Sequence, residues 1–206
     1  MPPRGPTLLE RPLARAIVAV ALLAAAGAGV GLLLLRDDGG GEALGGATAY
    51  AGPVYVVCDV DAGGGPAIGA PAPSFSLCDG DGDVVFETAD PGASVTFINF
   101  WATWCVPCRR ELPDIQTVYE EKRDRGLQVF AINHEEDRET AVAFLNSRGV
   151  TLPLVLDPEG RLYDAFRLQG LPDSFFIGDD GTLRTLQYGF LTEDKMRERI
   201  AQAGLP

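Results

Sequence analysis

Two cysteines separated by two residues form the most reactive pattern in this chain. Cys105 and Cys108 stand in the segment Trp-Cys-Val-Pro-Cys, where a predicted buried strand over residues 94–100 leads into a predicted helix over residues 106–125. A thiol at the first turn of a helix meets unpaired N–H groups and the positive end of the helix dipole, and both stabilise a thiolate. We therefore expect Cys105 to be an exposed nucleophile and Cys108, one turn deeper, to resolve the mixed disulfide that it forms.

Two other interpretations of paired cysteines fit this sequence poorly. A zinc site needs a second pair of ligands, whereas Cys58, Cys78 and His134 are isolated from one another in the chain. A purely structural disulfide across two residues gains little, because the loop that it closes is so short. The pair is thus expected to be redox-active, to hold no metal and to need no cofactor.

The first residues of the chain read as a membrane segment. Twenty uncharged residues rich in Ala, Val and Leu fall within residues 16–36, which is enough for a helix to cross a bilayer core of about 30 Å. Arginines in the basic segment 1–15 and aspartates after the apolar segment predict a cytoplasmic N-terminus and a catalytic domain on the extracytoplasmic side of the cell membrane. A cleaved signal peptide is the alternative, and it leads to the same compartment.

The rest of the chain divides into a linker and one domain. Residues 37–65 are rich in glycine and predict a flexible linker, with a possible edge strand over residues 54–60. Residues 66–206 predict a single α/β domain with a mixed sheet flanked by helices. Its net acidity, within a total charge of −12, argues against a nucleic-acid partner. The expected strands span residues 75–77, 84–87, 94–100, 127–132, 154–156, 174–177 and 183–188, and the expected helices span residues 106–125 with a kink at Pro113, 137–148, 161–166 and one capped by Thr192.

Cys58 and Cys78 have only each other as intramolecular partners once the reactive pair is set aside. Outside the cytoplasm such a bond forms and persists, so we expect a structural disulfide between them. Two free, buried thiols remain the alternative, because the sequence does not prove connectivity.

Three segments of the domain resemble one known family. Residues 99–113, Asn-Phe-Trp-Ala-Thr-Trp-Cys-Val-Pro-Cys-Arg-Arg-Glu-Leu-Pro, resemble the signature of the TlpA/ResA-like branch of the thioredoxin superfamily, which includes the DsbE/CcmG-type proteins of cytochrome c maturation. Residues 69–77 resemble the family's entry segment, and residues 170–177 occupy the place of its cis-proline loop. The resemblance covers residues 66–206 and implies a thioredoxin-like fold with an N-terminal β-hairpin extension.

The resemblance also assigns roles around the cysteines. It implies that Pro172 has a cis peptide bond facing the pair, and that Leu171 before it influences redox poise and partner fit. Glu111 lies on the helix face close to both cysteines, and the family pattern gives it the proton of Cys108. Classical thioredoxins use a buried aspartate on the preceding strand instead, and here that position is Asn99. Trp104, beside the nucleophile, is expected to belong to the substrate-docking surface.

Together these observations predict a membrane-anchored reductase of protein disulfides. We expect its partners to be disulfide-containing proteins, with apocytochrome c as the substrate that the resemblance suggests, and a membrane electron donor that restores the dithiol. A disulfide oxidant of the same fold is an alternative, since the residues between the cysteines do not fix a potential. Another is a copper-binding chaperone that uses Cys105, Cys108 and His134.

Overall fold

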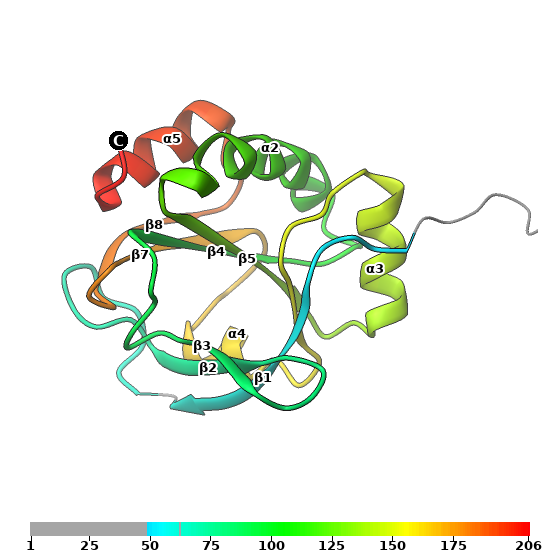
Figure 1. Cartoon of the computed structure of the whole chain (residues 1–206), viewed down its shortest axis with the longest axis horizontal. Coiled ribbons are helices and arrows are strands. Elements are labelled where there is room, and N and C mark those ends of the chain that lie inside the picture. Colours follow the sequence, from blue (N-terminus) through cyan, green and yellow to red (C-terminus); the bar gives the residue numbers. More distant parts are fainter. Residues whose placement is uncertain (1–48, 62) are drawn as a thin grey trace, which may run out of the picture. The chain divides into compact units, whose positions relative to one another are not determined.

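One eight-stranded sheet runs through the part of the chain that the computed structural model describes, residues 49–61 and 63–206 (Figure 1). The strand order is β3-β2-β1-β6-β5-β4-β7-β8, with parallel pairing from β1 through β6 and β5 to β4. The strands on either side of this parallel centre pair in the antiparallel sense. The strands are β1 (Val54–Asp61), β2 (Ser74–Cys78), β3 (Val84–Glu87), β4 (Val95–Trp101), β5 (Leu127–His134), β6 (Leu154–Asp157), β7 (Asp173–Gly178) and β8 (Leu183–Tyr188).

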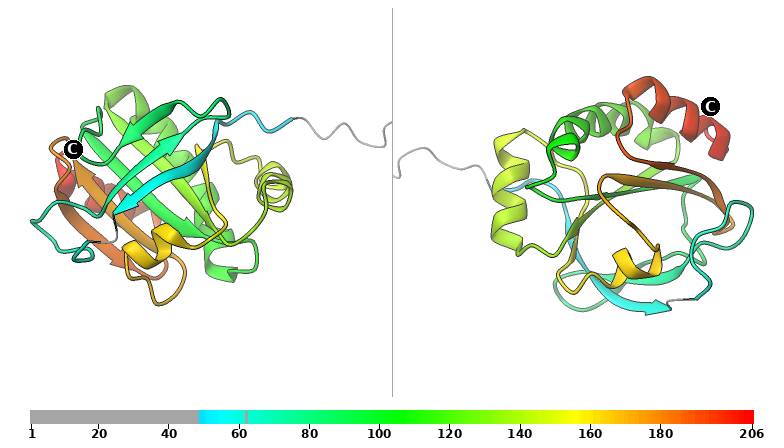
Figure 2. Two further views of the ribbon diagram at one scale, coloured as in Figure 1. Left: turned by 90° about the horizontal axis from the view of Figure 1, so that it is seen from below. Right: turned by 180° about the vertical axis from the view of Figure 1, so that it is seen from behind.

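Helices cover both faces of this sheet. The helices are α2 (Val106–Lys122), followed by the short 3-10 helix η1 (Arg123–Arg125), then α3 (Arg138–Ser147), α4 (Arg161–Ala165) and α5 (Glu193–Ala203). Apolar residues of α2, α3 and α5 pack on one face, whereas those of α4 pack on the other. Figure 2 shows the molecule from two further sides, with α2 and α5 next to each other on their face of the sheet.

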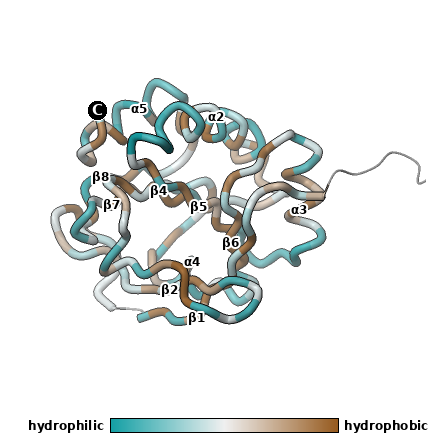
Figure 3. The backbone as a smooth tube through the Cα atoms, viewed as in Figure 1, coloured by the Kyte–Doolittle hydropathy of each residue, from teal (hydrophilic) through white to brown (hydrophobic). Residues whose placement is uncertain are grey.

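The central strand β4 shows why the sheet is buried on both faces. Successive side chains of a strand point to opposite faces, so Phe97 and Trp101 join the core beneath α2 while Ile98 and Phe100 join the core beneath α4. All of its residues are buried. Figure 3 shows hydrophobic residues along the inner strands and a mixture of hydrophobic and hydrophilic residues along the helices. The strand that leads into the cysteine pair is therefore fixed by packing on both sides.

Several predicted elements form where the sequence places them. The hairpin of β2 and β3 forms, α3 begins after the N-cap Asp137, and α5 begins after the N-cap Thr192. The first predicted helix is one continuous α-helix that contains Pro113, and it ends at Lys122, where the 3-10 helix takes over.

The predicted position of the first strand is wrong. Residues 54–60 were expected at an edge, but β1 lies inside the sheet, parallel to β6 on one side and antiparallel to β2 on the other. Its residues are half-buried or exposed, and its parallel partner β6 lies about a hundred residues further along the chain. The sheet thus begins at Val54, ahead of the domain start expected at Pro66.

The predicted membrane segment lies outside the described residues. This applies to residues 1–15, to the apolar residues 16–36 and to residues 37–48 of the glycine-rich linker. Within residues 49–61 and 63–206, no helix is long and apolar enough to cross a membrane.

Candidate active site

The two cysteines of the Cys-x-x-Cys motif lie at the start of α2. Cys105 is the N-cap of this helix, and its Sγ accepts a hydrogen bond from the backbone N–H of Cys108 at 3.3 Å. The two residues are joined by a disulfide, with their Cα atoms 5.3 Å apart. An N-cap sulfur that already accepts a backbone N–H is placed to be stabilised as a thiolate after reduction.

Cys105 is less accessible than the sequence predicted. Its residue is 4% exposed and Cys108 is 0% exposed, because both sulfurs turn toward each other and the core beneath α2. The neighbours Trp104 and Val106 are instead 64% and 61% exposed. Two exposed apolar side chains therefore flank the disulfide, and the docking role of Trp104 stays a prediction.

The two arginines after Cys108 do not direct their charges at the sulfurs. The guanidinium of Arg109 lies 5.8 Å from the ring centre of Phe144, and that of Arg110 lies 5.7 Å from the ring centre of Phe190. Both are cation–π contacts on the flanks of α2. The thiolate of Cys105 must therefore be stabilised mainly by the helix terminus.

Glu111 is a fully buried carboxyl group one turn beyond Cys108. Its Oε1 accepts a hydrogen bond from Asn99 Nδ2 at 3.0 Å, and its Oε2 accepts one from the backbone N–H of Leu191 at 3.1 Å. Burial raises the pKa of Glu111 to about 8, because desolvation outweighs the two hydrogen bonds, and the nearby Asp114 raises the pKa further. A carboxyl group that titrates near neutral pH can accept and return a proton during catalysis.

Asn99 on β4 connects Glu111 on α2 with Ser174 on β7. Its Nδ2 donates to Glu111 on α2 and also to Ser174 Oγ on β7 at 3.1 Å. The Oδ1 atom of Asn99 is buried and accepts no hydrogen bond from the described residues. The position that carries an acid in classical thioredoxins therefore holds a neutral donor here, which orients the carboxyl group of Glu111.

The predicted proline loop lies at the same end of the sheet. The Leu171–Pro172 peptide bond is cis, as the resemblance implies. Asp173 follows it and pairs with Phe100 of β4, the strand that leads into the cysteine motif. Leu171 is half-buried and packs against the cores on both faces of the sheet. The structure thus brings the proline loop beside the end of the strand that carries the cysteines.

Asp173 is a second acid with a perturbed titration. It is 5% exposed, and its Oδ1 accepts a hydrogen bond from the backbone N–H of Gly189 at 3.0 Å. Burial raises the pKa of Asp173 to about 6 despite this hydrogen bond. The sequence analysis assigned no role to this residue.

Sequence reasoning missed Glu136, which holds the loop before the nucleophile. Its carboxylate accepts hydrogen bonds from the backbone N–H of Thr103 at 2.8 Å, from the Thr103 hydroxyl and from Asn133 Nδ2 at 2.7 Å. Thr103 lies two residues before Cys105, whereas Glu136 follows β5. The ends of the neighbouring parallel strands β4 and β5 meet at one edge of the sheet, and this is the signal that could have connected the two.

The other two cysteines also form a disulfide in the structure. Cys58 on β1 and Cys78 on β2 have their Cα atoms 5.8 Å apart, and Cys58 stands at an irregularity in the pairing of these strands. The bond joins the adjacent strands β1 and β2, and both of its cysteines precede the reactive pair in the chain.

His134, the third ligand of the copper alternative, is largely buried against an aromatic ring. It ends β5, its ring stacks on Tyr163 with the ring centres 4.2 Å apart, and its side chain is 13% exposed. Tyr163 belongs to the core on the α4 face, whereas the reactive cysteines belong to the core beneath α2. No group of three or more His, Cys, Asp or Glu in the described ranges is arranged to hold a metal ion. Nothing in this geometry favours the copper site proposed as an alternative.

Comparison with known proteins agrees with this arrangement. The model of the AhpC/TSA family matches residues 68–186, which is more than half of the chain. The chain is 33% identical to the thiol-disulfide oxidoreductase ResA of Bacillus subtilis over 130 residues, 63% of this chain and 72% of that protein. It is 31% identical to ResA of Geobacillus thermodenitrificans over 134 residues, 65% of this chain and 76% of that protein.

Solved structures give the same result. A protein of Chlorobium tepidum described as a thiol:disulfide interchange protein DsbE superposes with a TM-score of 0.58 at 30% identity, covering 68% of this chain and 99% of that one. StoA from Bacillus subtilis superposes with a TM-score of 0.54 at 25% identity, covering 63% and 97%. The chain therefore belongs to the AhpC/TSA family and is a protein thiol-disulfide oxidoreductase of the ResA/DsbE-like thioredoxin superfamily.

Proposed function

We propose that this protein is a membrane-anchored reductase of protein disulfides that works on the extracytoplasmic side of the cell membrane. The observation that carries the proposal is the reactive pair itself, an N-cap cysteine with its partner one turn along α2 and a buried glutamate one turn further. The apolar residues 16–36 support the anchor, and the arginines before them support the orientation.

The reaction consists of two exchanges. The thiolate of Cys105 attacks one sulfur of the substrate disulfide, forms a mixed disulfide and releases the other substrate sulfur as a thiolate. Cys108 then loses its proton to Glu111 and attacks the Cys105 sulfur, which releases the second substrate sulfur as a thiolate. Glu111 then gives up the proton, and the released thiolate becomes a thiol. Two electrons pass from the dithiol to the substrate, and Cys105 and Cys108 end as a disulfide. A membrane electron donor must reduce that disulfide before the next cycle.

The surroundings of the pair favour the reducing direction. Oxidants of this type owe their potential to a strongly stabilised thiolate. Here the guanidinium groups of Arg109 and Arg110 lie over aromatic rings, and the nearest buried ionisable group on α2 is the acid Glu111. A mostly neutral acid beside the pair adds no positive charge that would stabilise the thiolate, so the dithiol gives up its electrons more readily than that of an oxidant.

The substrate class follows from the relatives. The ResA and DsbE proteins are named for thiol-disulfide exchange, which supports disulfide-containing proteins as the substrates of this chain. Among these we propose apocytochrome c, whose cysteines must be reduced before haem attachment. The exposed side chains of Trp104 and Val106 would hold such a flexible segment against the motif.

Trapping of the mixed disulfide tests this function. The Cys108→Ser variant of the full-length chain should accumulate covalent adducts with substrate proteins through Cys105, because the second exchange is blocked. The Cys105→Ser variant is the matched control and should trap none. If Cys108→Ser yields no adduct that dithiothreitol releases, or if Cys105→Ser traps the same proteins, the proposed role of the pair is wrong.

A further inference from the structure

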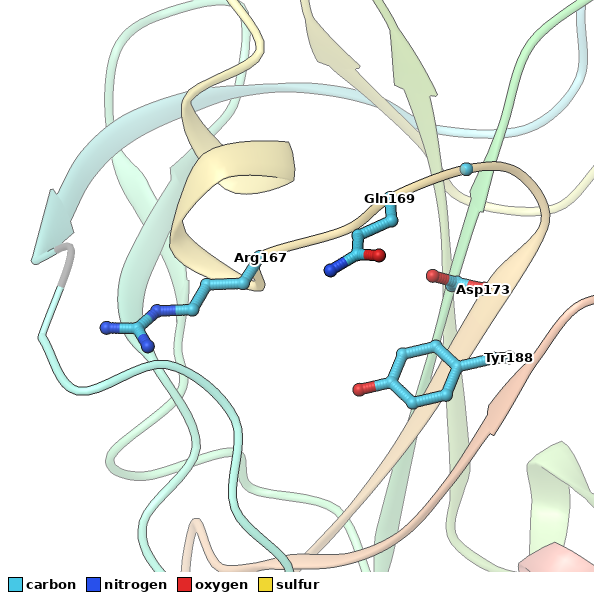
Figure 4. Close-up of a pocket in the computed structure, with 5 residues that line it drawn as sticks. Arg167, Gln169, Asp173 and Tyr188 are labelled. Atoms are coloured by element: carbon cyan, nitrogen blue, oxygen red, sulfur yellow. The ribbon is translucent and has the colours of Figure 1, made fainter.

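A pocket of about 350 Å³ opens beside the Leu171–Pro172 bond. Figure 4 shows it between the loop that follows α4 and the adjoining ends of β7 and β8. Its lining consists of polar side chains and one glycine, namely Arg167, Gln169, Gly170, Asp173 and Tyr188. The exchange mechanism above uses none of these residues.

The pocket and the reactive cysteines lie at the same end of the sheet, on opposite faces. Asp173 is the first residue of β7 and pairs with Tyr188, the last residue of β8. Ser174, next along β7, hydrogen-bonds on the α2 face, so the alternation of the strand turns Asp173 to the α4 face. The Leu171–Pro172 bond stands between the two faces. An extended substrate segment that crosses this bond would present alternate side chains to the cysteines and to the pocket.

The interior of the pocket attracts a cation. The buried carboxylate of Asp173 accepts one hydrogen bond through Oδ1, and no lysine or arginine of residues 49–61 and 63–206 forms a salt bridge with it. In Figure 4 the side chains of Gln169 and Tyr188 point into the same space, whereas the guanidinium of Arg167 points away from it. Arg167 lies instead against Gly65, where a Cβ atom would come within 2.6 Å of its Cδ.

We propose that this pocket binds a lysine or arginine side chain of the protein substrate, close in sequence to the cysteine that Cys105 attacks. Lysine and arginine carry only donors, and the pocket offers acceptors in the carboxylate of Asp173, the amide oxygen of Gln169 and the hydroxyl of Tyr188. The exposed ring of Tyr188 adds a face for a cation–π contact. The volume is ample for one long side chain, since pockets of about 300 Å³ already hold whole small ligands. The inference rests on the proposed reductase function and names a feature of its substrates.

Synthetic disulfide peptides test the pocket directly. The probes are peptides with one internal disulfide that carry lysine, norleucine or glutamate at a single position, moved stepwise through the residues beside each cysteine. The full-length chain is reduced with dithiothreitol and freed of it, and the rate constant for reduction of each peptide is measured. At one or two positions we expect the rate constant of the lysine peptide to exceed that of the norleucine peptide about tenfold, because one charge-assisted hydrogen bond contributes that much. The rate constant of the glutamate peptide should fall below both.

Variants locate the preference within the structure. Asp173→Asn should reduce the ratio of the lysine to the norleucine rate constant to near one. Tyr188→Leu should also lower this ratio, because it removes the hydroxyl acceptor and the ring that offers a cation–π contact. The ratio is taken within one variant, so a change in the reactivity of the cysteine pair cancels. Asp179→Asn, an exposed carboxylate beyond the end of β7, is the matched control and should keep the full ratio.

The outcomes separate this inference from the proposed function. If all peptides are reduced at equal rates, or if glutamate peptides react fastest, the reductase function stands and the cation pocket is wrong. If no peptide is reduced, the reductase function fails and the pocket proposal fails with it. The comparison of peptides on the unmodified chain decides the matter even if Asp173→Asn does not fold.

Discussion

At the scale of single residues, Glu111 decides how the reactive pair handles protons. Among residues 49–61 and 63–206 it is the one carboxyl group inside the core beneath α2, and its two hydrogen bonds come from Asn99 on β4 and from the backbone of Leu191. Burial raises the pKa of Glu111 to about 8, so a modest change of pH alters its charge. The same group therefore affects both catalysis and stability.

Glu111→Gln should slow the second exchange step. The rate at which Cys108 closes on the mixed disulfide should rise with pH up to about 8 in the wild type, as Glu111 becomes able to accept the proton. In the variant this dependence should vanish and the rate should fall by about 100-fold. Stopped-flow measurement of mixed-disulfide decay gives both quantities. Glu120→Gln, a change on the exposed side of α2, is the control, and an unchanged pH profile in Glu111→Gln would refute the assigned role.

Glu111 should also make stability depend on pH. Its pKa is higher in the folded chain than the ordinary value of 4.5, so between pH 4.5 and about 8 the folded state binds more protons than the unfolded state. The free energy of unfolding should therefore fall as pH rises through this window, by ~5 kcal/mol at most. Asp173 titrates with the same sign, so the difference between wild type and Glu111→Gln isolates Glu111. Denaturant unfolding at pH 5 and pH 8.5 measures it, and parallel behaviour of the two proteins would contradict the burial of a titrating acid.

At the scale of elements, the loop between β4 and α2 is positioned from β5. Three hydrogen bonds converge on Glu136, two of them from Thr103, and they connect the loop that carries Trp104 to the next parallel strand. Glu136 does not contact the sulfurs in the structure, so we regard it as a positioning residue.

Glu136→Gln should lower the reactivity of Cys105, because a single amide oxygen cannot replace the carboxylate at all three donors. We expect a fall of about tenfold in its rate with a small aromatic disulfide, together with a shift in the apparent pKa of its thiol. Thr103→Ser keeps the hydroxyl and should react like wild type, whereas Thr103→Val should lose part of the rate. Glu139→Gln on α3 is the matched control. If Glu136→Gln lowers only the melting temperature, its role is structural and the positioning role is wrong.

The disulfide between β1 and β2 gives a second prediction at the scale of elements. Replacing Cys58 and Cys78 together by alanine removes the bond between β1 and β2, which spans a separation of 20 residues. The free energy of unfolding should fall by about 2 kcal/mol, since the unfolded chain regains the freedom of that loop. Disulfide exchange at Cys105 should persist. Free thiols at both positions in the native protein purified under oxidising conditions would show that the bond does not form.

At the scale of the whole molecule, the sequence predicted most elements because their signals are local. The apolar run of β4, the N-caps Asp137 and Thr192, and the glycine-containing turn between β2 and β3 each act within a few residues. The cysteine motif and its glutamate could be recognised for the same reason, since one helix carries them all.

The features that the sequence missed depend on contacts between distant segments. The interior place of β1 depends on β6, about a hundred residues further along the chain. The contact of Glu136 with Thr103 joins residues 33 positions apart, and the burial of Cys105 follows from the packing of α2. The stacking of His134 on Tyr163, which holds its ring against α4, joins residues 29 positions apart. No short pattern encodes any of these.

The reduction potential of the Cys105–Cys108 pair tests the account most directly, because it decides which way electrons flow. The full-length chain is equilibrated in dithiothreitol buffers of known ratio at pH 7, and the reduced fraction is measured by alkylation of its thiols. We expect a potential more negative than about −220 mV, in the range of thioredoxin and far from that of strong oxidants. A less negative value, and above all one near −120 mV, would contradict the reductase and indicate a disulfide oxidant of the same fold.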